Sequence, residues 1–510
     1  ECALLAGVLK SPANYDPVDK PDNSVARRNL VLNEMYAEKF ITKENLDVAV
    51  NDPLKISLKK DYAVFNSPAP QFTEYVRQQM EGIAVKHGYD LYRDGLKVYT
   101  TLDSRFQKHA VDAVVKQLST FQKSFNGYWN WNSPQRKQIL DDAVSRNIRF
   151  SEEYKKAKTE EERKNIADRL KADKKFIDSV KILTSTVQVG FVVMNPKTGE
   201  IKAMVGSNPN SNFKYGLNHV TQIKRQPGSS FKPFVYAEAI IKGYSPGYKI
   251  SNAPLIVNTG GTTWSPKGGG TGGSISLRDA LAKSVNVVAA RTAMEIAPIG
   301  DVIKLAHNMG INSELPNVIS LSLGAGEVTP LEITNAFGTF ANEGIWVEPI
   351  AILKIEDRNG KVIEEFHPQT REAMSEETAY IMSDMMQGVI DYGTATSVRQ
   401  FFQRPAAGKT GTSQSYTDAW FIGFTPQFVA GVWLGFDDAR VKFGGSYGQG
   451  GTAAAPIWGR FMGKLYSDDQ FDFPIAYFLM PETIEEAAVC TVTGMRSNGS
   501  CPAVTDLSIK

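Results

Sequence analysis

The sequence predicts a mixed α/β (α+β) fold in which helices flank a mainly antiparallel sheet, and two observations support this prediction. The segment VQVGFVVMNPKTGEIKAMVG, which starts at Val187, places two apolar runs around a Pro-Lys-Thr-Gly turn, as in a β-hairpin. Further on, the helical pattern LRDALAKSVNVVAARTAMEIA precedes the apolar strands FIGFTP and FVAGVWLGF. Helices and strands therefore alternate around one sheet.

Changes in pattern divide the chain into five segments. Residues 1–60 have helical patterns, and 61–105 form a connector that ends in the strand-like GLKVYTTLD. Residues 106–180 are helical again and are predicted to be an insertion, 181–466 hold the mixed α/β domain, and 467–510 form a C-terminal extension. The first segment is too small to make a stable domain alone.

The predicted helical insertion is strongly charged. SEEYKKAKTEEERKNIADRLKADKKF pairs opposite charges at helical spacing, which favours a solvated helix over a binding surface. Just upstream, Tyr128, Trp129 and Trp131 could stack on sugar rings. We favour the alternative, in which these aromatic side chains anchor the insertion to its domain.

Composition limits the possible functions. Lys and Arg number 57 against 55 Asp and Glu, without a separate basic tract, which disfavours nucleic-acid binding. The chain has no apolar run of about 18 residues, and its opening ECALLAGVLKSP is neither signal peptide nor anchor, so we expect residues upstream. Cys490 and Cys501 flank a Gly- and Ser-containing loop, for which a disulfide and two free thiols both remain open.

The first chemical motif is an S-x-x-K pair, Ser229 and Lys232, in RQPGSSFKPF. Pro227 and Gly228 break the chain, so we expect a helix to begin at the serine, with both side chains on one face. An amine held in a partly desolvated cleft has a lowered pKa and can accept a serine proton. Ser229 is therefore the predicted nucleophile and Lys232 its base.

The second motif is Ser284 and Asn286 in LAKSVNVVAA. The hydroxyl suits relay of a proton to a leaving amine, and the amide can hold a substrate peptide group. Such short patterns also recur by chance. Ser57 and Lys60 form another S-x-x-K, in a charged stretch without a preceding glycine, and 197–199 repeat the third motif, K-T-G, within the predicted hairpin turn.

The third motif, AAGKTGTS, predicts a strand along the site. Lys409 supplies a cation, and Thr410 and Thr412 supply hydroxyls, for a substrate carboxylate. Gly411 permits close approach of the backbone. We expect the N–H groups of this strand to bind substrate peptide.

The three motifs, in this order and with their flanks, resemble a known family. With LSLGAGEVTPLEITNAFGTFANEG, DAWFIGFTP and AAAPIWGRFM, they are similar to the transpeptidase domain of class A penicillin-binding proteins. The opening ECALLAGVLKSPANYDP and the later ARRNLVL resemble the end of that family's glycosyltransferase domain, and APQFTEYVRQQM resembles its linker. The resemblance implies a penicilloyl serine transferase fold, related to β-lactamases.

The resemblance also implies a reaction. Ser229 is acylated by a stem peptide ending in D-Ala-D-Ala, with the backbone N–H groups of Ser229 and Thr412 as the oxyanion hole. Terminal D-alanine leaves, and an amine from a neighbouring stem peptide makes the cross-link. β-Lactams resemble the D-Ala-D-Ala end and trap Ser229. Neither a cofactor nor a metal is implied, and the five His residues do not cluster near the cysteines as a zinc site requires.

The family's glycosyl-transfer glutamates lie upstream of this sequence, so we expect no glycan polymerisation from the chain itself. A missing N-terminal anchor is expected to attach the protein to the extracytoplasmic face of the bacterial cell membrane. Two departures affect the rim of the predicted cleft. Ser207 and Asn208 replace the usual glycines, and TTWSPKGGGTGGS is unusually rich in glycine.

Three alternative functions share these motifs. A β-lactamase needs a water-positioning glutamate in E-x-x-L-N, and the nearest approach, Glu332 to Asn335, does not fit. A non-catalytic β-lactam sensor is disfavoured by the linker and the glycosyltransferase remnant. A D,D-carboxypeptidase differs only in passing the acyl group to water, and this alternative remains open.

Overall fold

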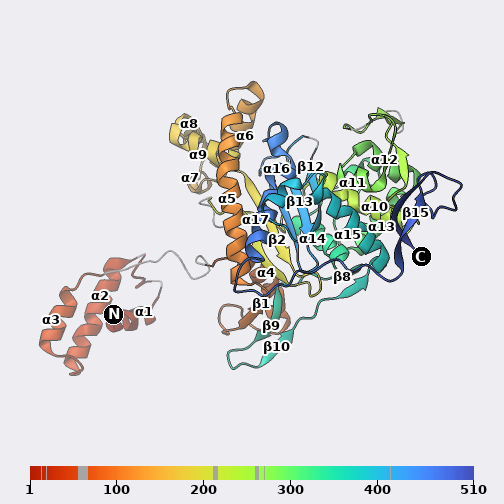
Figure 1. Ribbon diagram of the computed structural model, residues 1–510. Helices are drawn as coiled ribbons and strands as arrows, with labels where there is room; N and C mark the ends of the chain where they lie inside the picture. The colour runs from red at the N-terminus through yellow and green to blue at the C-terminus, as the bar shows by residue number, and fades with distance from the viewer. Residues whose placement is uncertain are drawn as a thin grey trace. The chain divides into compact units, whose positions relative to one another are not determined.

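The computed structural model describes residues 1–12, 14–18, 20–54, 67–210, 216–258, 263–268, 270–413 and 415–510. The chain divides into two compact units, an N-terminal unit, Glu1–Asn66, and a main unit, Ser67–Lys510 (Figure 1). None of the helices within the described ranges combines the length and apolar character needed to cross a membrane.

The N-terminal unit consists of helices α1 (Cys2–Leu9), α2 (Pro21–Ala37) and α3 (Lys43–Asn51). Thr42 caps α3, because its side chain accepts a hydrogen bond from the N–H of Asn45 at 3.2 Å. Among the described residues of this unit, the buried apolar core consists of Ala3, Leu32 and Leu46. Such a core is small for an independent domain.

The main unit is built on a five-stranded antiparallel sheet with the strand order β12-β13-β14-β2-β3, which confirms the predicted fold class. The strands are β2 (Gln188–Met194), β3 (Ile201–Val205), β12 (Ala407–Thr412), β13 (Ala419–Phe424) and β14 (Val429–Gly435). The predicted hairpin is β2–β3, and both faces of the sheet are buried.

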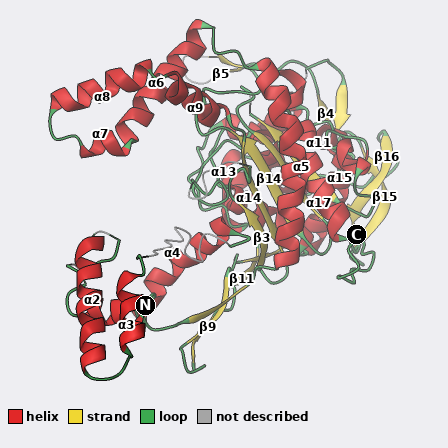
Figure 2. Cartoon of the chain, turned by 90° about the vertical axis from the view of Figure 1, so that its left-hand side faces the viewer, coloured by secondary structure: helices red, strands yellow, loops and turns green. Residues whose placement is uncertain are grey.

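Two helical layers cover the sheet, and β2 contributes alternate residues to each. Val189, Phe191 and Val193 pack with α5 (Ser104–Tyr128) and α17 (Ala455–Leu465). Figure 2 shows these two helices in front of the strands. The other face packs against α10 (Lys232–Ile241), α14 (Pro330–Ala341) and α15 (Glu376–Asp391).

Smaller elements complete the main unit. Three strands form a second antiparallel sheet with the order β1-β9-β10. The bounds are α4 (Pro70–Lys86), β1 (Lys97–Thr100), β4 (Lys249–Ser251), β5 (Val257–Asn258), β6 (Thr263–Trp264), β7 (Ser274–Ser276), α11 (Leu277–Ala282), α12 (Asn286–Glu295), α13 (Ile299–Asn308), β8 (Ile345–Val347), β9 (Ile352–Glu356), β10 (Val362–Glu365), β11 (Thr370–Glu372) and α16 (Gly450–Ala453).

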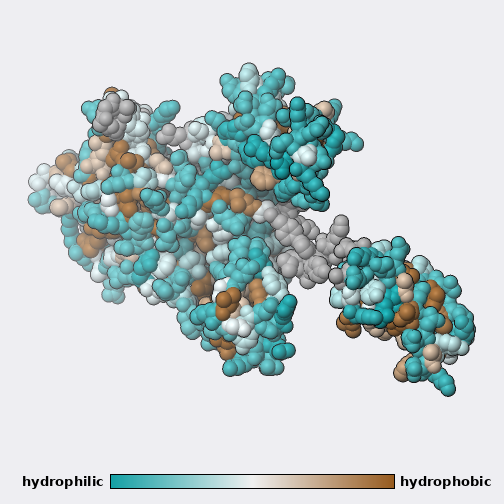
Figure 3. Space-filling view, turned by 180° about the vertical axis from the view of Figure 1, so that it is seen from behind, coloured by the Kyte–Doolittle hydropathy of each residue, from teal (hydrophilic) through white to brown (hydrophobic). Residues whose placement is uncertain are grey.

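The helical insertion differs in extent from the predicted 106–180. Helix α5 belongs to the main core, because its apolar face from Phe106 to Phe125 packs against the sheet layer. The helices that extend away from the sheet are α6 (Pro134–Phe150), α7 (Glu152–Lys156), α8 (Glu160–Ala172) and α9 (Lys174–Ser185) (Figures 1 and 2). Their surface is mainly hydrophilic, as their charge pattern indicates (Figure 3).

The aromatic cluster before α6 acts as an anchor. The ring of Trp129 stacks on Phe125 with centroids 5.6 Å apart, and the Arg136 guanidinium lies 4.3 Å from the Trp129 ring centroid. Trp131 packs edge-on against Trp129. These contacts tie the insertion to α5 and support the interpretation favoured from the sequence.

The C-terminal extension ends in the hairpin β15 (Ile484–Cys490) and β16 (Ala503–Ile509). A disulfide joins Cys490 to Cys501, with 5.8 Å between their Cα atoms, which decides between the two alternatives that the sequence left open. Cys2 is exposed and free.

Candidate active site

Ser229 lies in a tight turn just before α10. The turn is a 3-10 helix, Gly228–Phe231, and the α-helix proper begins at Lys232, three residues later than predicted. Pro233 explains the shift, because the first turn of an α-helix is where a residue without an N–H is tolerated. The hydroxyl of Ser230 donates to the carbonyl of Pro227 at 2.7 Å and fastens the turn.

Lys232 lies at the centre of a buried hydrogen-bond network. Its side chain has no exposed surface, and Nζ donates to the carbonyl of Ser284 and to Oδ1 of Asn286, both at 2.6 Å. The Ser284 hydroxyl lies 3.2 Å from the same nitrogen. Burial, and secondarily the charge of Lys409, lowers the pKa of Lys232 well below its ordinary value.

Lys409 reaches the same hydroxyl from strand β12. Its Nζ lies 2.9 Å from the Ser284 Oγ and donates to the Thr410 carbonyl at 3.0 Å. The side chain is fully buried, and this burial lowers the pKa of Lys409 to about 7. The Ser284 hydroxyl therefore connects the two lysine amines.

The backbone of Ser284 is left-handed, with φ 58°, which is uncommon for a residue other than glycine. Ser284 follows the end of α11, where a left-handed residue commonly ends a helix, and α12 begins two residues later at Asn286. This short turn between two helices places the hydroxyl of Ser284 and the amide of Asn286 on the same lysine. The Asn286 Nδ2 also donates to the carbonyl of Lys267 in the glycine-rich rim.

Strand β12 passes directly beside the Ser229 turn, and glycines allow this approach. A Cβ on Gly411 would lie 2.3 Å from the Pro227 carbonyl oxygen, and a Cβ on Gly228 would lie 2.5 Å from that of Thr412. The same position on Gly228 lies 3.2 Å from the backbone nitrogen of Thr412. The Thr412 hydroxyl accepts a hydrogen bond from the N–H of Gly450 at 3.1 Å.

A further contact, not predicted from the sequence, holds the turn from another side. Gly324 ends the 3-10 helix Ile319–Leu323 with φ 77°, and a Cβ there would lie 2.1 Å from the Gly228 carbonyl oxygen. Gly324 lies in the segment LSLGAGEVTP, whose resemblance to the family did not by itself indicate this contact.

The structure thus brings Lys232, Ser284, Asn286 and Lys409 into one hydrogen-bond network, and β12 carries Thr410, Gly411 and Thr412 past it. Thr410 Oγ1 lies 2.5 Å from the Thr394 hydroxyl. Ser229 itself is half-buried, and its hydroxyl has no hydrogen-bond partner among the residues that the structure describes. A hydroxyl in this state is available to a ligand.

Comparison with known proteins agrees with this arrangement. Residues 189–462 match the family described as the penicillin binding protein transpeptidase domain. The chain belongs to this family. It is 33% identical over 516 residues to penicillin-binding protein 1A of Neisseria lactamica and 31% identical over 504 residues to that of Aquifex aeolicus (strain VF5).

These matches confirm the resemblance to class A penicillin-binding proteins. The match to the Neisseria lactamica relative covers 91% of this chain and 63% of the relative, so the chain spans less than two thirds of that relative's length. The fold is shared with a crystal structure of penicillin-binding protein 1A from Haemophilus influenzae, with a TM-score of 0.74 and 24% identity over 99% of this chain and 85% of that one. PonA1 from Mycobacterium tuberculosis, solved in complex with penicillin V, has a TM-score of 0.55 and 21% identity over 80% of this chain and 96% of that one.

In this member of the family, a cleft of about 1100 Å³ borders the Ser229 turn. Gly228, Gly324 and Thr412 line this cleft, together with the loop after β14 and the first turns of α6. The helical insertion therefore forms part of the wall of the cleft.

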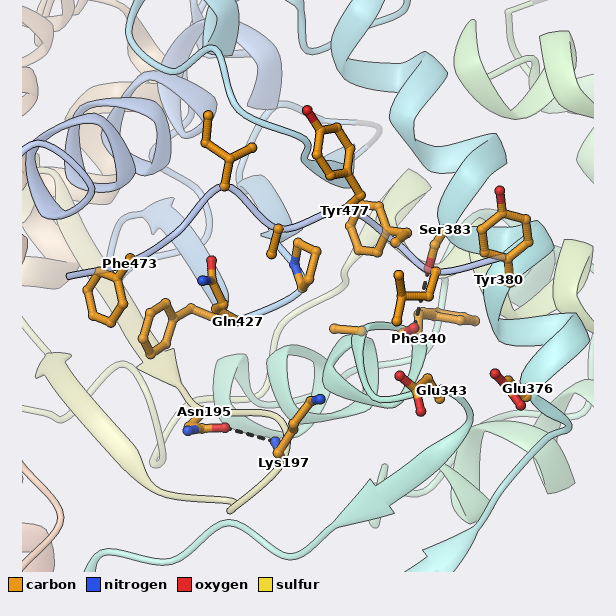
Figure 4. A pocket seen from close by; sticks show the side chains of 17 residues that line it. Asn195, Lys197, Phe340, Glu343, Glu376, Tyr380, Ser383, Gln427, Phe473 and Tyr477 are labelled. Carbon is orange, nitrogen blue, oxygen red and sulfur yellow. Dashed lines mark hydrogen bonds between the residues drawn. The ribbon is translucent and has the colours of Figure 1, made fainter. Parts of the chain in front are cut away.

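Another cavity, shown in Figure 4, contains none of the predicted site residues. It has a volume of about 650 Å³ and lies beneath the chain from Phe473 to Leu479, against α14 and α15. Lys197, from the second K-T-G sequence, borders this cavity in the β2–β3 turn, where its N–H donates to Oδ1 of Asn195 at 2.9 Å. Ser57 and Lys60 lie outside the described residues.

Proposed function

We propose that this chain is a peptidoglycan D,D-transpeptidase that forms peptide cross-links through a serine acyl-enzyme and is covalently inhibited by β-lactams. One observation carries the proposal, the buried network in which Ser284 connects Lys232 to Lys409. A neutral lysine amine can accept the proton of a serine hydroxyl, which is the role proposed for Lys232. A charged lysine amine can bind a substrate carboxylate, which is the role proposed for Lys409. The network brings both groups to one hydroxyl, that of Ser284.

Acylation begins when Lys232 accepts the proton of Ser229 and the serine oxygen attacks the carbonyl carbon of the penultimate D-alanine of a stem peptide. The N–H groups of Ser229 and Thr412 stabilise the negative oxygen that develops. The proximity of Gly228 to the Thr412 backbone nitrogen supports this pairing. When the C–N bond breaks, the terminal D-alanine takes a proton that reaches it through Ser284.

Substrate binding falls to the residues that surround this network. Lys409, Thr410 and Thr412 bind the terminal carboxylate of the donor peptide, and Asn286 binds one of its peptide groups. Gly411 lets β12 lie directly against the Ser229 turn, so that a donor peptide paired with the backbone of β12 lies beside the serine. An amine of a second stem peptide then attacks the acyl-enzyme, which releases Ser229 and completes the cross-link.

Glycosyltransferase activity is proposed for the full-length protein and not for this chain, whose residues 1–60 resemble only the end of that domain. A membrane anchor outside this sequence, and a position on the extracytoplasmic face of the bacterial cell membrane, belong to the same proposal. Peptidoglycan stem peptides and β-lactams are the proposed ligands.

The structure offers no support for a β-lactamase at Glu332. Its carboxylate accepts hydrogen bonds from the hydroxyl of Ser313 at 2.8 Å and from the N–H groups of Thr329 and Asn312, both at 3.0 Å. Glu332 thereby caps α14 and is occupied as a structural group. The D,D-carboxypeptidase and the non-catalytic sensor remain alternatives, and the following experiment separates them.

The test is labelling with a fluorescent penicillin, followed by intact-mass spectrometry, for the unaltered chain, Ser229→Ala and the matched control Ser57→Ala. We expect stable labelling that only Ser229→Ala abolishes. Incubation with a D-Ala-D-Ala peptide and an acceptor amine then separates the remaining functions: cross-linked product indicates a transpeptidase, hydrolysed product a carboxypeptidase, and no turnover a sensor. Rapid release of the label would indicate a β-lactamase, and no labelling of the unaltered chain would refute the proposal.

A further inference from the structure

The cleft beside Ser229 is lined by five charged side chains, and three of them are already satisfied. Arg225 donates to the carbonyl of Phe436 at 2.7 Å and lies 4.0 Å from the carboxylate of Asp418. Asp418 also accepts from the indole N–H of Trp433 at 2.9 Å. The side chains of Arg225 and Asp418 therefore have partners within the protein and stabilise the wall of the cleft.

The third satisfied group, Arg440, attaches the helical insertion to the cleft. Its guanidinium donates to Asp142 on α6 at 2.6 Å and to Asp438 at 2.7 Å. Arg146, one turn further along α6, adds a longer ion pair to the same Asp438 at 3.5 Å. Ion pairs thus connect α6 to the loop after β14. The wall that α6 contributes is therefore part of the cleft in the folded protein.

The two remaining charged side chains, Glu327 and Lys442, are exposed and form no ion pair or side-chain hydrogen bond within the described part of the chain. The backbone of Glu327 is fixed, because the next residue, Val328, exchanges two backbone hydrogen bonds of 3.0 Å with Arg225. Lys442 lies two residues after Arg440, on the loop that α6 holds. The amide of Gln135 on α6 borders the same cleft and is also without a partner among the described residues.

We propose that Glu327 and Lys442 form the binding site for the second substrate, an acceptor peptide that carries both an ammonium group and a free carboxylate. This inference rests on the proposed transpeptidase function and deepens it. The donor carboxylate is already assigned to Lys409, so an additional free cation and a free carboxylate on one cleft complement a second, zwitterionic ligand. Glu327 binds its ammonium group, and Lys442, with Gln135, binds its carboxylate.

The chemical step that this site serves is aminolysis of the acyl-enzyme. The acceptor ammonium first gives one proton to solvent. The resulting amine attacks the ester carbonyl, so a C–N bond forms and the bond from carbon to Ser229 Oγ breaks. The proton lost by the acceptor amine passes to Lys232 and from there to the departing serine oxygen. By holding the acceptor next to the ester, the pair of charges favours the amine over water.

The experiment uses the full chain with a soluble donor, diacetyl-lysyl-D-alanyl-D-alanine, and two acceptor probes, D-methionine and D-methioninamide, which differ in the free carboxylate. The measurement is the ratio of aminolysis to hydrolysis products by mass spectrometry. We expect the unaltered chain to favour D-methionine over its amide. Lys442→Gln should abolish this preference, and Glu327→Gln should lower aminolysis by both probes about three- to five-fold, as for a partly exposed ion pair.

Two matched controls, Lys361→Gln and Glu372→Gln, change exposed charges that do not line the cleft and should leave the ratio unchanged. The rate of penicillin labelling should stay within about two-fold in every variant, because Lys409 binds the penicillin carboxylate. The inference is overturned if the ratio does not change in Glu327→Gln and Lys442→Gln, or if labelling falls in parallel with aminolysis, since the pair would then serve the donor. Absence of labelling in the unaltered chain would instead refute the proposed function itself.

Discussion

At the scale of single residues, the site depends on two buried lysines that share one hydroxyl. Lys232 and Lys409 have no exposed surface, and both approach the Ser284 Oγ. Two like charges this close in a desolvated site oppose each other, so one lysine gives up its proton before the other. Burial and the charge of Lys409 both lower the pKa of Lys232, whereas burial alone lowers the pKa of Lys409. This asymmetry supports the proposed roles, in which Lys232 is the neutral base and Lys409 is the cation.

Burying two lysine amines together should lower the stability of the folded chain. Replacing Lys409 tests this expectation. We expect Lys409→Met to raise the free energy of unfolding by about 1–3 kcal/mol below pH 7, since it removes a buried charge. Burial lowers the pKa of Lys409 from its ordinary value of 10.5 to about 7 in the folded chain. Between these values the unfolded chain binds more protons, so the unaltered protein gains stability as pH rises. The advantage of the variant should therefore shrink from pH 7 towards pH 10.

Chemical denaturation at pH 6, 8 and 9.5 measures this difference, with the exposed Lys361→Met as the control that should show none. Lys409→Met should also slow penicillin labelling by about 10- to 100-fold, the value of a lost charge-assisted hydrogen bond. A variant that is less stable than the unaltered chain at pH 6 would show that Lys409 contributes net stability, against this account.

At the scale of elements, the site depends on how closely three backbone segments meet at Gly228. The residue is left-handed, with φ 55°, and a Cβ there would lie 2.5 Å from the carbonyl oxygen of Thr412. Gly228→Ala must therefore move β12 away from the turn or distort the turn itself. We expect it to lower the free energy of unfolding by about 1–3 kcal/mol and to slow penicillin labelling at least ten-fold.

The control for this substitution is Gly82→Ala in α4, where an added Cβ meets nothing within 4 Å. Alanine in a helix interior should stabilise the chain by about 0.5–1 kcal/mol and leave labelling unchanged. Thermal unfolding and the labelling rate together test both variants. Normal labelling by Gly228→Ala would mean that the oxyanion hole does not depend on this close approach.

The elements also show what the sequence could and could not predict. The β2–β3 hairpin followed from two apolar runs around a turn, and strand β12 from the K-T-G motif. The residue types at Ser229, Lys232 and Lys409 follow from the chemistry of acyl transfer. The role of α6 could not be predicted, because a charged solvated helix has the same pattern whether or not one end borders a cleft. One of the contacts that place it joins Asp142 to Arg440, which lie almost 300 positions apart in the chain.

At the scale of the whole molecule, the structure consists of two units whose apolar cores differ greatly in size. The main unit has two large apolar clusters that share the central sheet, and every residue of the proposed site lies within it. In the described part of the N-terminal unit, Glu1–Asn66, the buried apolar core consists of Ala3, Leu32 and Leu46. We therefore expect the apolar core of the larger unit to be sufficient for independent folding, and that of the smaller unit to be insufficient.

A chain that starts at Ser67 should thus keep both the fold and the site. We expect its rate of penicillin labelling to match that of the full chain within about two-fold, and its thermal midpoint to fall by no more than about 2 °C, a change well under 1 kcal/mol for a protein of this size. Residues 1–66 alone should show no cooperative transition, because so small a core cannot offset the conformational entropy of ordering three helices. Loss of labelling by a shortened chain that still unfolds cooperatively would contradict this prediction. It would mean that the site needs the N-terminal unit, although the two apolar cores are separate.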